Sequence, residues 1–382
     1  MAKIETIDVG FYRLPLKEVL VDAMHGEHHV FEIITVTVTD ADGATGVGYT
    51  FTGGHNGGAI HDIAAREIPA IAIGEDADRI EWLWERIWWA THYGGRGGPT
   101  VLALSAFDIA LWDLKAKRAN LPLYSLLGGH SDRVSCYAGG IDMHLTPDQL
   151  LAQSDRNFER GFRAIKMKVG RDRLSEDVEK LAAMRGHFGD GFPLMVDANM
   201  KWTVSEAIAA ARAFTPYQPK WLEEPIIPDD VEGCARVARE GGLPIAMGEN
   251  FRTIWEFKHA LTVGHVAFPE PDVTNCGGVT PFMKICHLAE AFNLPVTSHG
   301  AHDITVHLLA AAPNGEMLEA HGFGLDDYIE QPMEIIEGDD LHGLFDIVIE
   351  QPMEIIEGDA IAPDRPGHGM VFDFDKLEHL RA

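Results

Sequence analysis

Short apolar runs alternate with longer helical patterns through the middle of the chain. Three of these runs open with proline and end in an acidic residue, at Asp197, Glu223 and Glu249, so both intervals between the acids are 26 residues. A run of this length followed by a helical pattern is typical of a buried parallel strand in a βα unit. Because the carboxyl ends of neighbouring barrel strands face one site, we expect the three carboxylates to converge.

The strand pattern occurs eight times between residues 134 and 320. The predicted strands cover residues 134–138, 163–169, 193–197, 219–223, 244–249, 265–268, 294–298 and 316–320. Helical patterns lie between them, at residues 175–185, 205–214, 254–262 and 281–292. Eight βα units in this stretch predict a parallel (β/α) barrel.

The first 128 residues have a different pattern and predict a separate domain. Residues 33–39 are β-branched and alternating, and Asp42-Gly43 is a hairpin signal. Two polar loops rich in Gly and His, at residues 21–29 and 50–58, flank this hairpin and are of the kind that closes over a ligand. A helical pattern follows, and Gly128-Gly129 marks the boundary before a barrel of residues 129–320.

The tail, residues 321–382, contains a tandem repeat. The segment 329–339 recurs unchanged as 349–359, with a period of 20 residues. A solenoid needs at least about three repeats. We therefore interpret the repeat as a local duplication and assign it no chemistry.

Composition narrows the class of protein. The 382 residues carry a formal net charge of −28, which disfavours nucleic acid and anionic membrane as partners and leaves an anionic substrate in need of a local cation. No apolar run approaches the roughly 18 residues of a transmembrane helix, and the N-terminus lacks the apolar region of a signal peptide. The four cysteines are scattered and form no CxxC motif, which fits a reducing, cytoplasmic location.

Acids and lysines at the predicted strand ends suggest chemistry. Three converging carboxylates cannot all stay ionised without a cation, and hard oxygen ligands suit Mg²⁺; the alternative is three solvated loop acids that never meet. Lys166 and Lys168 lie two residues apart on one predicted strand, so both point to the same face. We expect them to depress each other's pKa, with burial adding to the effect, which would make a lysine a usable base. On a surface edge strand both lysines would simply be solvated.

Polar residues also end the later strands. Asp272 follows the sixth strand and His299 ends the seventh, so the two could lie within hydrogen-bond reach. The carboxylate would then fix the imidazole tautomer and raise its basicity. Taken alone, His299 would more often be structural, as one of 19 histidines. Glu319 ends the eighth strand and completes a ring of polar strand ends.

These motifs together resemble the mandelate racemase subgroup of the enolase superfamily, over essentially the whole chain. The matching motifs are Lys166-Met-Lys168, Val-Asp197-Ala-Asn199, Trp-Leu-Glu223-Glu-Pro, Met-Gly-Glu249-Asn, Pro271-Asp272 before Gly277-Gly278-Val, Ser298-His299 and Leu318-Glu319. The resemblance implies a (β/α)7β modified TIM barrel with an α+β N-terminal capping domain that the C-terminal tail completes. The sequence departs from muconate-cycloisomerase-like members, because no lysine lies between Gly264 and Val279.

The resemblance also implies roles for the metal ligands and the bases. One Mg²⁺ per subunit would bind the three strand-end carboxylates, Asp197, Glu223 and Glu249. Lys168 would be one acid/base and the His299–Asp272 dyad the other. A proton next to a carboxylate is very weakly acidic, and Mg²⁺ with lysine and hydrogen-bond donors stabilises the enediolate that its removal creates, as in enolase-superfamily sites generally.

Substrate contacts follow from the resemblance and from the loops. By resemblance, Lys166 would touch the substrate carboxylate and tune Lys168, Glu319 would donate a hydrogen bond to that carboxylate, and Asn199 would contact the substrate. The loops offer further polar side chains for a hydroxylated substrate: His25, His55 and Arg96 as the main candidates, with His28, His29 and Asn56 beside them.

The sequence therefore favours a dehydratase that converts an acid sugar to a 2-keto-3-deoxy acid. Without a suitable leaving group, the same two bases would give a racemase or epimerase of a 2-hydroxy acid. A zinc hydrolase is the remote alternative, suggested by His299, His302 and His307 but lacking an HExxH motif. Homo-oligomers are common in such families, and the Trp-rich segment 80–89 is a candidate interface.

Overall fold

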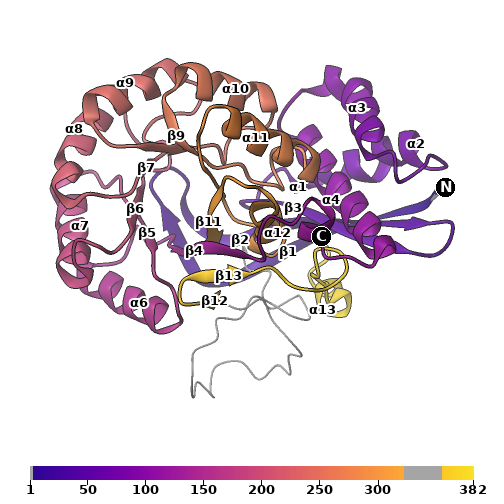
Figure 1. The fold of residues 1–382 in the computed structure, drawn as a ribbon, viewed down its shortest axis with the longest axis horizontal. Helices are drawn as coiled ribbons and strands as arrows, with labels where there is room; N and C mark the ends of the chain where they lie inside the picture. The colour runs from indigo at the N-terminus through magenta and orange to yellow at the C-terminus, as the bar shows by residue number, and fades with distance from the viewer. Residues whose placement is uncertain (1–2, 322–354) are drawn as a thin grey trace.

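A computed structural model describes residues 3–321 and 355–382. Within this part of the chain, a capping domain built on an antiparallel sheet lies beside a barrel of parallel strands that an arc of helices surrounds (Figure 1). The prediction of a modified TIM barrel with an α+β cap is confirmed.

The capping sheet consists of three long strands in the order β1-β2-β3. They are β1 (Ile4–Asp22), β2 (Gly26–Asp40) and β3 (Thr45–Thr52). The turn between β2 and β3 contains the predicted Asp42-Gly43 signal: Gly43 N donates to the Asp40 carbonyl oxygen over 2.9 Å, and Gly43 adopts the left-handed φ of 82° that glycine favours. The β1–β2 pair continues beyond the sheet as a two-stranded ribbon, in which Asp22 pairs with Gly26.

Helices cover one face of this sheet and connect it to the barrel. They are α1 (Gly57–Asp62), a π-helical turn (Ile63–Glu67), α2 (Ile68–Ala72), α3 (Ile80–Thr91), α4 (Pro99–Ala119) and α5 (Leu123–Leu126). Helix α4 is buried along most of its length because the sheet packs on one side of it and the barrel helix α11 (Val279–Ala291) on the other. Among the described helices, none combines the length and apolarity needed to cross a bilayer.

The barrel strands follow one another around a nearly closed ring. In the described residues these are β4 (Arg133–Gly139), β5 (Ile165–Lys168), β6 (Leu194–Asp197), β7 (Leu222–Glu223), β8 (Ile245–Met247), β9 (Val266–Pro269), β10 (Val296–Thr297) and β11 (Gly315–Ala320). Their hydrogen-bonded order runs β10-β11-β4-β5-β6-β7-β8-β9. All eight predicted strands are present, although most are shorter than their apolar runs.

The outer helices alternate with these strands, as a (β/α)7β arrangement requires. They are α6 (Pro147–Glu159), α7 (Leu174–Phe188), α8 (Val204–Phe214), α9 (Val231–Gly241), α10 (Ile254–Val263), α11 and α12 (His302–Ala311). Several begin with side-chain caps, and Thr146 and Thr203 form capping boxes with Gln149 and Glu206.

The described part of the tail packs against both domains. Strands β12 (Ile355–Ile356) and β13 (Asp359–Ile361) form a hairpin, and β13 pairs antiparallel with β4. Helix α13 (Phe374–Glu378) follows near the cap, where Arg13 N donates to Leu380 O over 2.9 Å. The first copy of the tandem repeat lies outside the described residues, as does the second copy before Ile355.

The structure corrects the predicted loop at residues 21–29. Strand β2 begins at Gly26, so only residues 23–25 lie outside the strands. His28 pairs with Leu20 across the ribbon. This ribbon projects from the sheet and covers little apolar surface, so histidine and glutamate can occupy its strand positions. The alternation of apolar and polar residues that marks a strand is therefore absent here.

Close packing of β3 on α4 predicts an asymmetric response to adding a methyl group. A Cβ at Gly48 would lie 2.2 Å from the Ala106 carbonyl oxygen, whereas one at Gly58 would meet nothing within 4 Å. We expect Gly48→Ala to lower the free energy of unfolding by about 1–3 kcal/mol through overpacking. Gly58→Ala should be neutral or stabilising by up to about 1 kcal/mol, because alanine favours the helix. Urea unfolding of both variants checks this, and equal midpoints would contradict the close packing.

Candidate active site

Three carboxylates converge at the carboxyl ends of neighbouring strands. Asp197 and Glu223 are the last residues of β6 and β7, and Glu249 follows β8. One carboxylate oxygen from each lies within 4.8 Å of the others. Asp197 and Glu223 are completely buried, whereas the Glu249 side chain keeps 11% of its surface exposed.

Strand periodicity explains how polar groups come to line one layer of the barrel. An apolar layer inside the barrel includes Met195, Trp221, Phe268 and Met317. Two residues further along each strand, the side chain points to the same interior, and these positions hold Asp197, Glu223, Glu270 and Glu319. The polar layer therefore lies directly above the apolar one, towards the carboxyl ends of the strands.

Glu249 reaches this layer through a break in strand geometry. Gly248 adopts a φ of 152°, and a Cβ there would lie 2.8 Å from the Glu270 carbonyl oxygen. Only glycine fits such a backbone without strain. The turn at Gly248 directs the next side chain, Glu249, towards Asp197 and Glu223.

The donor set of this cluster fits Mg²⁺. Burial, and next to it the neighbouring Asp197 carboxylate, raise the pKa of Glu223 to about 8. A cation beside Glu223 would favour its ionised form, and carboxylate oxygens are the ligands that Mg²⁺ prefers. Two further buried oxygens, Asn199 Oδ1 and Glu224 Oε1, have no hydrogen-bond partner among the described residues.

Two buried lysines on β5 contact these acids. Lys166 Nζ lies 2.7 Å from Glu223 Oε1 and 2.8 Å from Glu319 Oε1. Lys168 Nζ donates to Asp197 Oδ2. Both lysines point to the barrel interior, and the alternative of solvated lysines on an edge strand is excluded.

The expected lowering of the Lys168 pKa is wrong for this arrangement. Burial and the Lys166 ammonium do lower the pKa of Lys168, but Asp197 and Glu249 outweigh them and raise it above its ordinary value. Asp197 lies within hydrogen-bond reach of Lys168, and the spacing of residues along the chain does not reveal this contact. A divalent cation at the triad would compete with Lys168 for the charge of Asp197.

A histidine–aspartate dyad reaches the triad from another strand. His299 Nδ1 lies 2.8 Å from Asp272 Oδ2, and His299 Nε2 lies 3.1 Å from Glu249 Oε2. Thr274 holds Asp272 in place, since its backbone N and its Oγ1 donate to Oδ1 over 2.7 and 2.6 Å. Burial lowers the pKa of His299, but the carboxylates of Glu249 and Asp272 prevail and raise it to about 10.

Glu319 is an acceptor in the structure. Its Oε2 accepts a hydrogen bond of 2.9 Å from Gly300 N, and its Oε1 contacts Lys166. Burial raises the pKa of Glu319, but the Lys166 ammonium outweighs burial and lowers it below its ordinary value. The donor role that the resemblance implies for Glu319 would therefore require it to take up a proton.

The loop candidates differ in their distance from this centre. His25 lies near it, since Ala23 in the same turn packs against Gly170, two residues after Lys168. His55 and Arg96 are exposed, and none of the contacts among the described residues joins them to the triad. The loop that carries Arg96 does approach Arg252, whose Nη1 donates to the Glu249 carbonyl oxygen over 3.1 Å.

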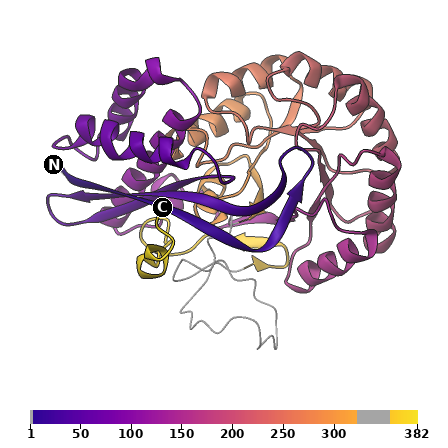
Figure 2. The same ribbon diagram turned by 180° about the vertical axis from the view of Figure 1, so that it is seen from behind.

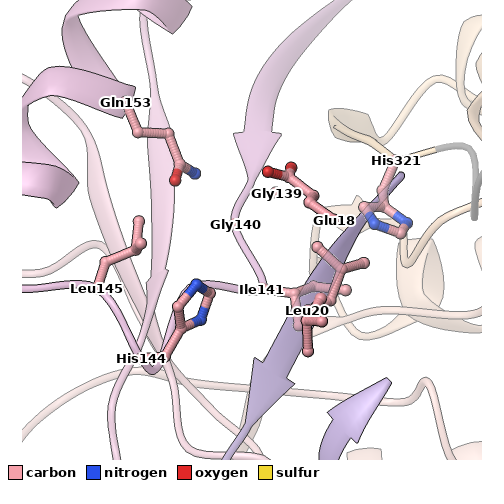
Figure 3. A pocket seen from close by; sticks show the side chains of 10 residues that line it. Glu18, Leu20, Gly139, Gly140, Ile141, His144, Leu145, Gln153 and His321 are labelled. Atoms are coloured by element: carbon pink, nitrogen blue, oxygen red, sulfur yellow. The ribbon is translucent and has the colours of Figure 1, made fainter. Parts of the chain in front are cut away.

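A small cavity of about 170 Å³ lies between the capping ribbon and the loop after β4 (Figure 3). Gln153 lies on one side of it and His321 on the other, with Glu18 and His144 also in the lining. Gly139 lines the cavity and also lies against the site, because a Cβ on it would lie 2.4 Å from Glu319 Oε1.

Sequence reasoning missed two polar residues beside the triad, the partly buried Asn250 and the buried Glu270. Asn250 Nδ2 donates to Glu224 Oε2 over 2.6 Å and to Glu249 Oε1 over 3.1 Å. Glu270 Oε1 accepts a hydrogen bond of 2.9 Å from Thr297 Oγ1. The signal for Glu270 was available, because it lies two residues after Phe268 on the same strand face.

The histidines that suggested a zinc hydrolase do not form a cluster with His299. His307 Nε2 lies 3.0 Å from the His368 carbonyl oxygen in the tail, and Tyr124 N donates to His307 Nδ1 over 3.4 Å. In the described residues, the groups able to hold a metal are the carboxylate triad and a second set, Asp22, His25 and His28, on the capping ribbon.

Comparison with known proteins agrees with this geometry. Residues 12–128 match the N-terminal domain of the mandelate racemase/muconate lactonizing enzyme family, and residues 149–376 match the enolase C-terminal domain-like family. A 3,6-anhydro-alpha-L-galactonate cycloisomerase from Streptomyces coelicolor is 50% identical over 99% of both chains. An L-talarate/galactarate dehydratase from Salmonella typhimurium is 38% identical over 82% of this chain and 79% of its own.

A solved structure shows the metal in a relative. The crystal structure of a racemase from Streptomyces coelicolor with bound magnesium has a TM-score of 0.92 and 48% identity, covering 99% of this chain and 100% of its own. Dehydratases are lyases and cycloisomerases are isomerases, so the relatives fall in the two enzyme classes that the sequence predicted. The chain belongs to the mandelate racemase/muconate lactonizing enzyme family of the enolase superfamily.

Proposed function

We propose that this enzyme removes the proton α to the carboxylate of an acid sugar and then expels the oxygen at the β carbon. The proposal rests on one observation: two candidate bases contact the same carboxylate triad. Lys168 contacts Asp197 from β5, and His299 contacts Glu249 from the end of β10. A substrate held at the triad would meet a base from each strand.

We assign the residues as follows. Asp197, Glu223 and Glu249 would hold Mg²⁺, which supplies positive charge that stabilises an enediolate. Lys166 and Glu319, whose buried side chains contact each other, would bind the substrate carboxylate. Asn199, with its buried unpaired Oδ1, would contact the substrate.

The reaction balances without a further reactant. Lys168 or the His299–Asp272 dyad takes the α-proton, and the electron pair of that C–H bond forms the enediolate. The pair then returns to form a carbon–carbon double bond while the bond from the β carbon to oxygen breaks. The departing oxygen takes a proton, and the enol product tautomerises to a 2-keto-3-deoxy acid.

The leaving oxygen decides between two outcomes. Loss of a hydroxyl gives a dehydratase, the reaction named for the Salmonella relative. Loss of a ring ether opens the ring and gives an isomer, the reaction class named for the Streptomyces relative that is 50% identical. Both are eliminations and use the same site. The polar lining of the cavity beside Glu319 supports a hydroxylated substrate over the aryl acid of a mandelate-like racemase.

Self-association remains a prediction. Trp89, Tyr93 and Trp255 are exposed, with 59%, 94% and 54% of their surfaces accessible. They lie at the end of α3 and the start of α10, and Trp88 and Trp255 have ring centroids 5.6 Å apart. This apolar surface supports the Trp-rich segment as an interface between copies.

A cytoplasmic location also remains a prediction.

The product identifies the reaction. We expect galactarate or 3,6-anhydro-L-galactonate, incubated with enzyme and Mg²⁺ in D₂O, to lose its α-proton signal and yield a keto-deoxy acid by NMR. Mass spectrometry of the same reaction in H₂O then separates the outcomes, because dehydration lowers the mass by one water whereas ring opening leaves it unchanged. Exchange of the α-proton without net product would support the racemase alternative. Absence of both exchange and product across an acid-sugar panel would contradict the proposal.

Removing the base should stop turnover. We expect Lys168→Ala to lower the rate of α-proton loss by about 100-fold or more, as is typical for a lost general base. Lys258→Ala, which changes an exposed lysine on α10, is the matched control and should retain the full rate. Equal rates in the two variants would remove Lys168 from the mechanism.

Metal binding should stabilise the fold through the triad. Mg²⁺ at 100 times its dissociation constant should add about 2.7 kcal/mol to the free energy of unfolding. Glu223→Gln should abolish this gain because it removes a charged ligand, whereas Glu232→Gln, at an exposed position on α9, should keep it. Thermal unfolding with and without Mg²⁺ measures the difference. A gain that persists in Glu223→Gln would place the metal elsewhere.

A further inference from the structure

The tip of the capping ribbon carries a second hydrogen-bonded set of histidines and aspartate. Asp22 is buried, and its Oδ2 lies 2.9 Å from His25 Nδ1 and 2.8 Å from His28 Nε2. The backbone N of Met24 and of His25 donates to Asp22 Oδ1 over 2.9 and 2.7 Å. Asp22 therefore fixes the conformation of the turn and the orientation of both imidazoles.

The ribbon places this tip at the mouth of the barrel. Figure 2 shows β1 and β2 extending from the cap across the barrel. Val21 N donates to the Ile141 carbonyl oxygen over 3.3 Å, and Met143 N donates to the Val21 carbonyl oxygen over 3.0 Å. Ala23 packs against Gly170, two residues after Lys168, where an added Cβ would lie 3.0 Å from that of Ala23. The tip is thus held over the ends of β4 and β5.

The two histidines of the tip differ in what they can reach. His28 is 13% exposed and stacks on Phe31 with ring centroids 5.8 Å apart. The His25 side chain is 54% exposed and contacts Asp22 through Nδ1, which leaves Nε2 as the nitrogen directed away from Asp22. The hydrogen bond to Asp22 raises the pKa of His25, Glu249 adds to this, and Lys168 opposes it. His25 therefore has the exposure and the charge environment of a proton donor near the site.

We propose that His25, oriented by Asp22, is the general acid that protonates the departing β-oxygen. The inference rests on the proposed elimination. The proton on His25 Nε2 passes to the oxygen as the bond to the β carbon breaks, and the electron pair of that bond stays with the oxygen. The neutral imidazole then regains a proton from solvent.

The ribbon tip approaches the site from the cap, whereas Lys168 and His299 belong to the barrel. Lys168 and His299 contact the triad itself, and so lie where the carboxylate and the α carbon would be bound. The β-oxygen of such a substrate would lie further from the carboxylate, on the cap side, from which the ribbon tip approaches. The fold thus presents two His–Asp pairs to one site: His299–Asp272 from the barrel and His25–Asp22 from the cap.

The test separates proton removal from loss of the leaving group. The elimination rate of His25→Gln on galactarate and 3,6-anhydro-L-galactonate should fall about 100-fold, the range of a lost general acid. Its substrate should still gain deuterium at the α carbon in D₂O, at a rate within about threefold of the wild-type rate of α-proton loss, because the bases are intact. His287→Gln is the matched control, since His287 lies on α11 away from the ribbon, is exposed and pairs with Glu290.

A substrate with a better leaving group gives a second readout. A 3-deoxy-3-fluoro sugar acid releases fluoride without needing a proton at the leaving atom. We expect His25→Gln to eliminate fluoride within about threefold of the wild-type rate, whereas a merely structural role for His25 would slow both substrates equally. Unchanged Mg²⁺-dependent stabilisation of the variant would show that it folds and binds the metal.

The outcomes are distinguishable from failure of the proposed function. Wild-type enzyme that neither exchanges nor eliminates would contradict the elimination itself. Active wild type with an equally active His25→Gln variant would overturn the role of His25, and so would a variant that loses exchange and elimination together. Elimination that requires Zn²⁺ in addition to Mg²⁺ would assign Asp22, His25 and His28 to a metal and would also overturn the proposal.

Discussion

Repulsion among buried carboxylates is the constraint on which this structure depends. Asp197, Glu223 and Glu319 lie in the barrel interior with almost no solvent contact. Removing an ion from water costs several kcal/mol, even after the protein relaxes. Lys166 offsets part of that cost by contacting Glu223 and Glu319 together. The site can hold this much negative charge because positive charge balances it: the lysines supply part of that charge, and a metal at the triad would supply the rest.

The junction between the two domains keeps the cap in position over this charge. Asp108 on α4 accepts hydrogen bonds of 2.9 and 2.7 Å from Thr280 N and Oγ1 at the start of α11. Trp84 Nε1 donates to the Gly277 carbonyl oxygen over 2.8 Å. Polar groups buried in a domain interface specify one relative orientation, because any other orientation leaves them unpaired. Because the ribbon with Asp22 and His25 is part of the cap, the same junction also fixes its position over the barrel.

Much of the barrel and of its site could be predicted because both follow from short-range periodicity. The interval of 26 residues marked the three acids, and the spacing of two placed Lys166 and Lys168 on one face. The strand-end positions of Asp272 and His299 suggested that the two lie within hydrogen-bond reach, and the family resemblance then gave the dyad its acid/base role. What failed depended on distances across the fold. The pKa of Lys168 is raised because Asp197 contacts it, and sequence spacing does not reveal that contact. Asp22 contacts two histidines only because the tip of the β1–β2 ribbon brings residues 22, 25 and 28 together.

The pairing of β13 with β4 has a consequence for the tandem repeat. The residues that begin this hairpin, Ile355-Ile-Glu-Gly-Asp359, also occur 20 residues earlier in the chain, so the repeat itself does not specify which copy pairs with the barrel. The next residue does. Ala360 is fully buried opposite Val134, whereas the residue in the corresponding place of the first copy is Asp340. An unpaired charge at that buried position would be costly, so the residue just beyond the duplicated segment favours the second copy for the pairing with β4.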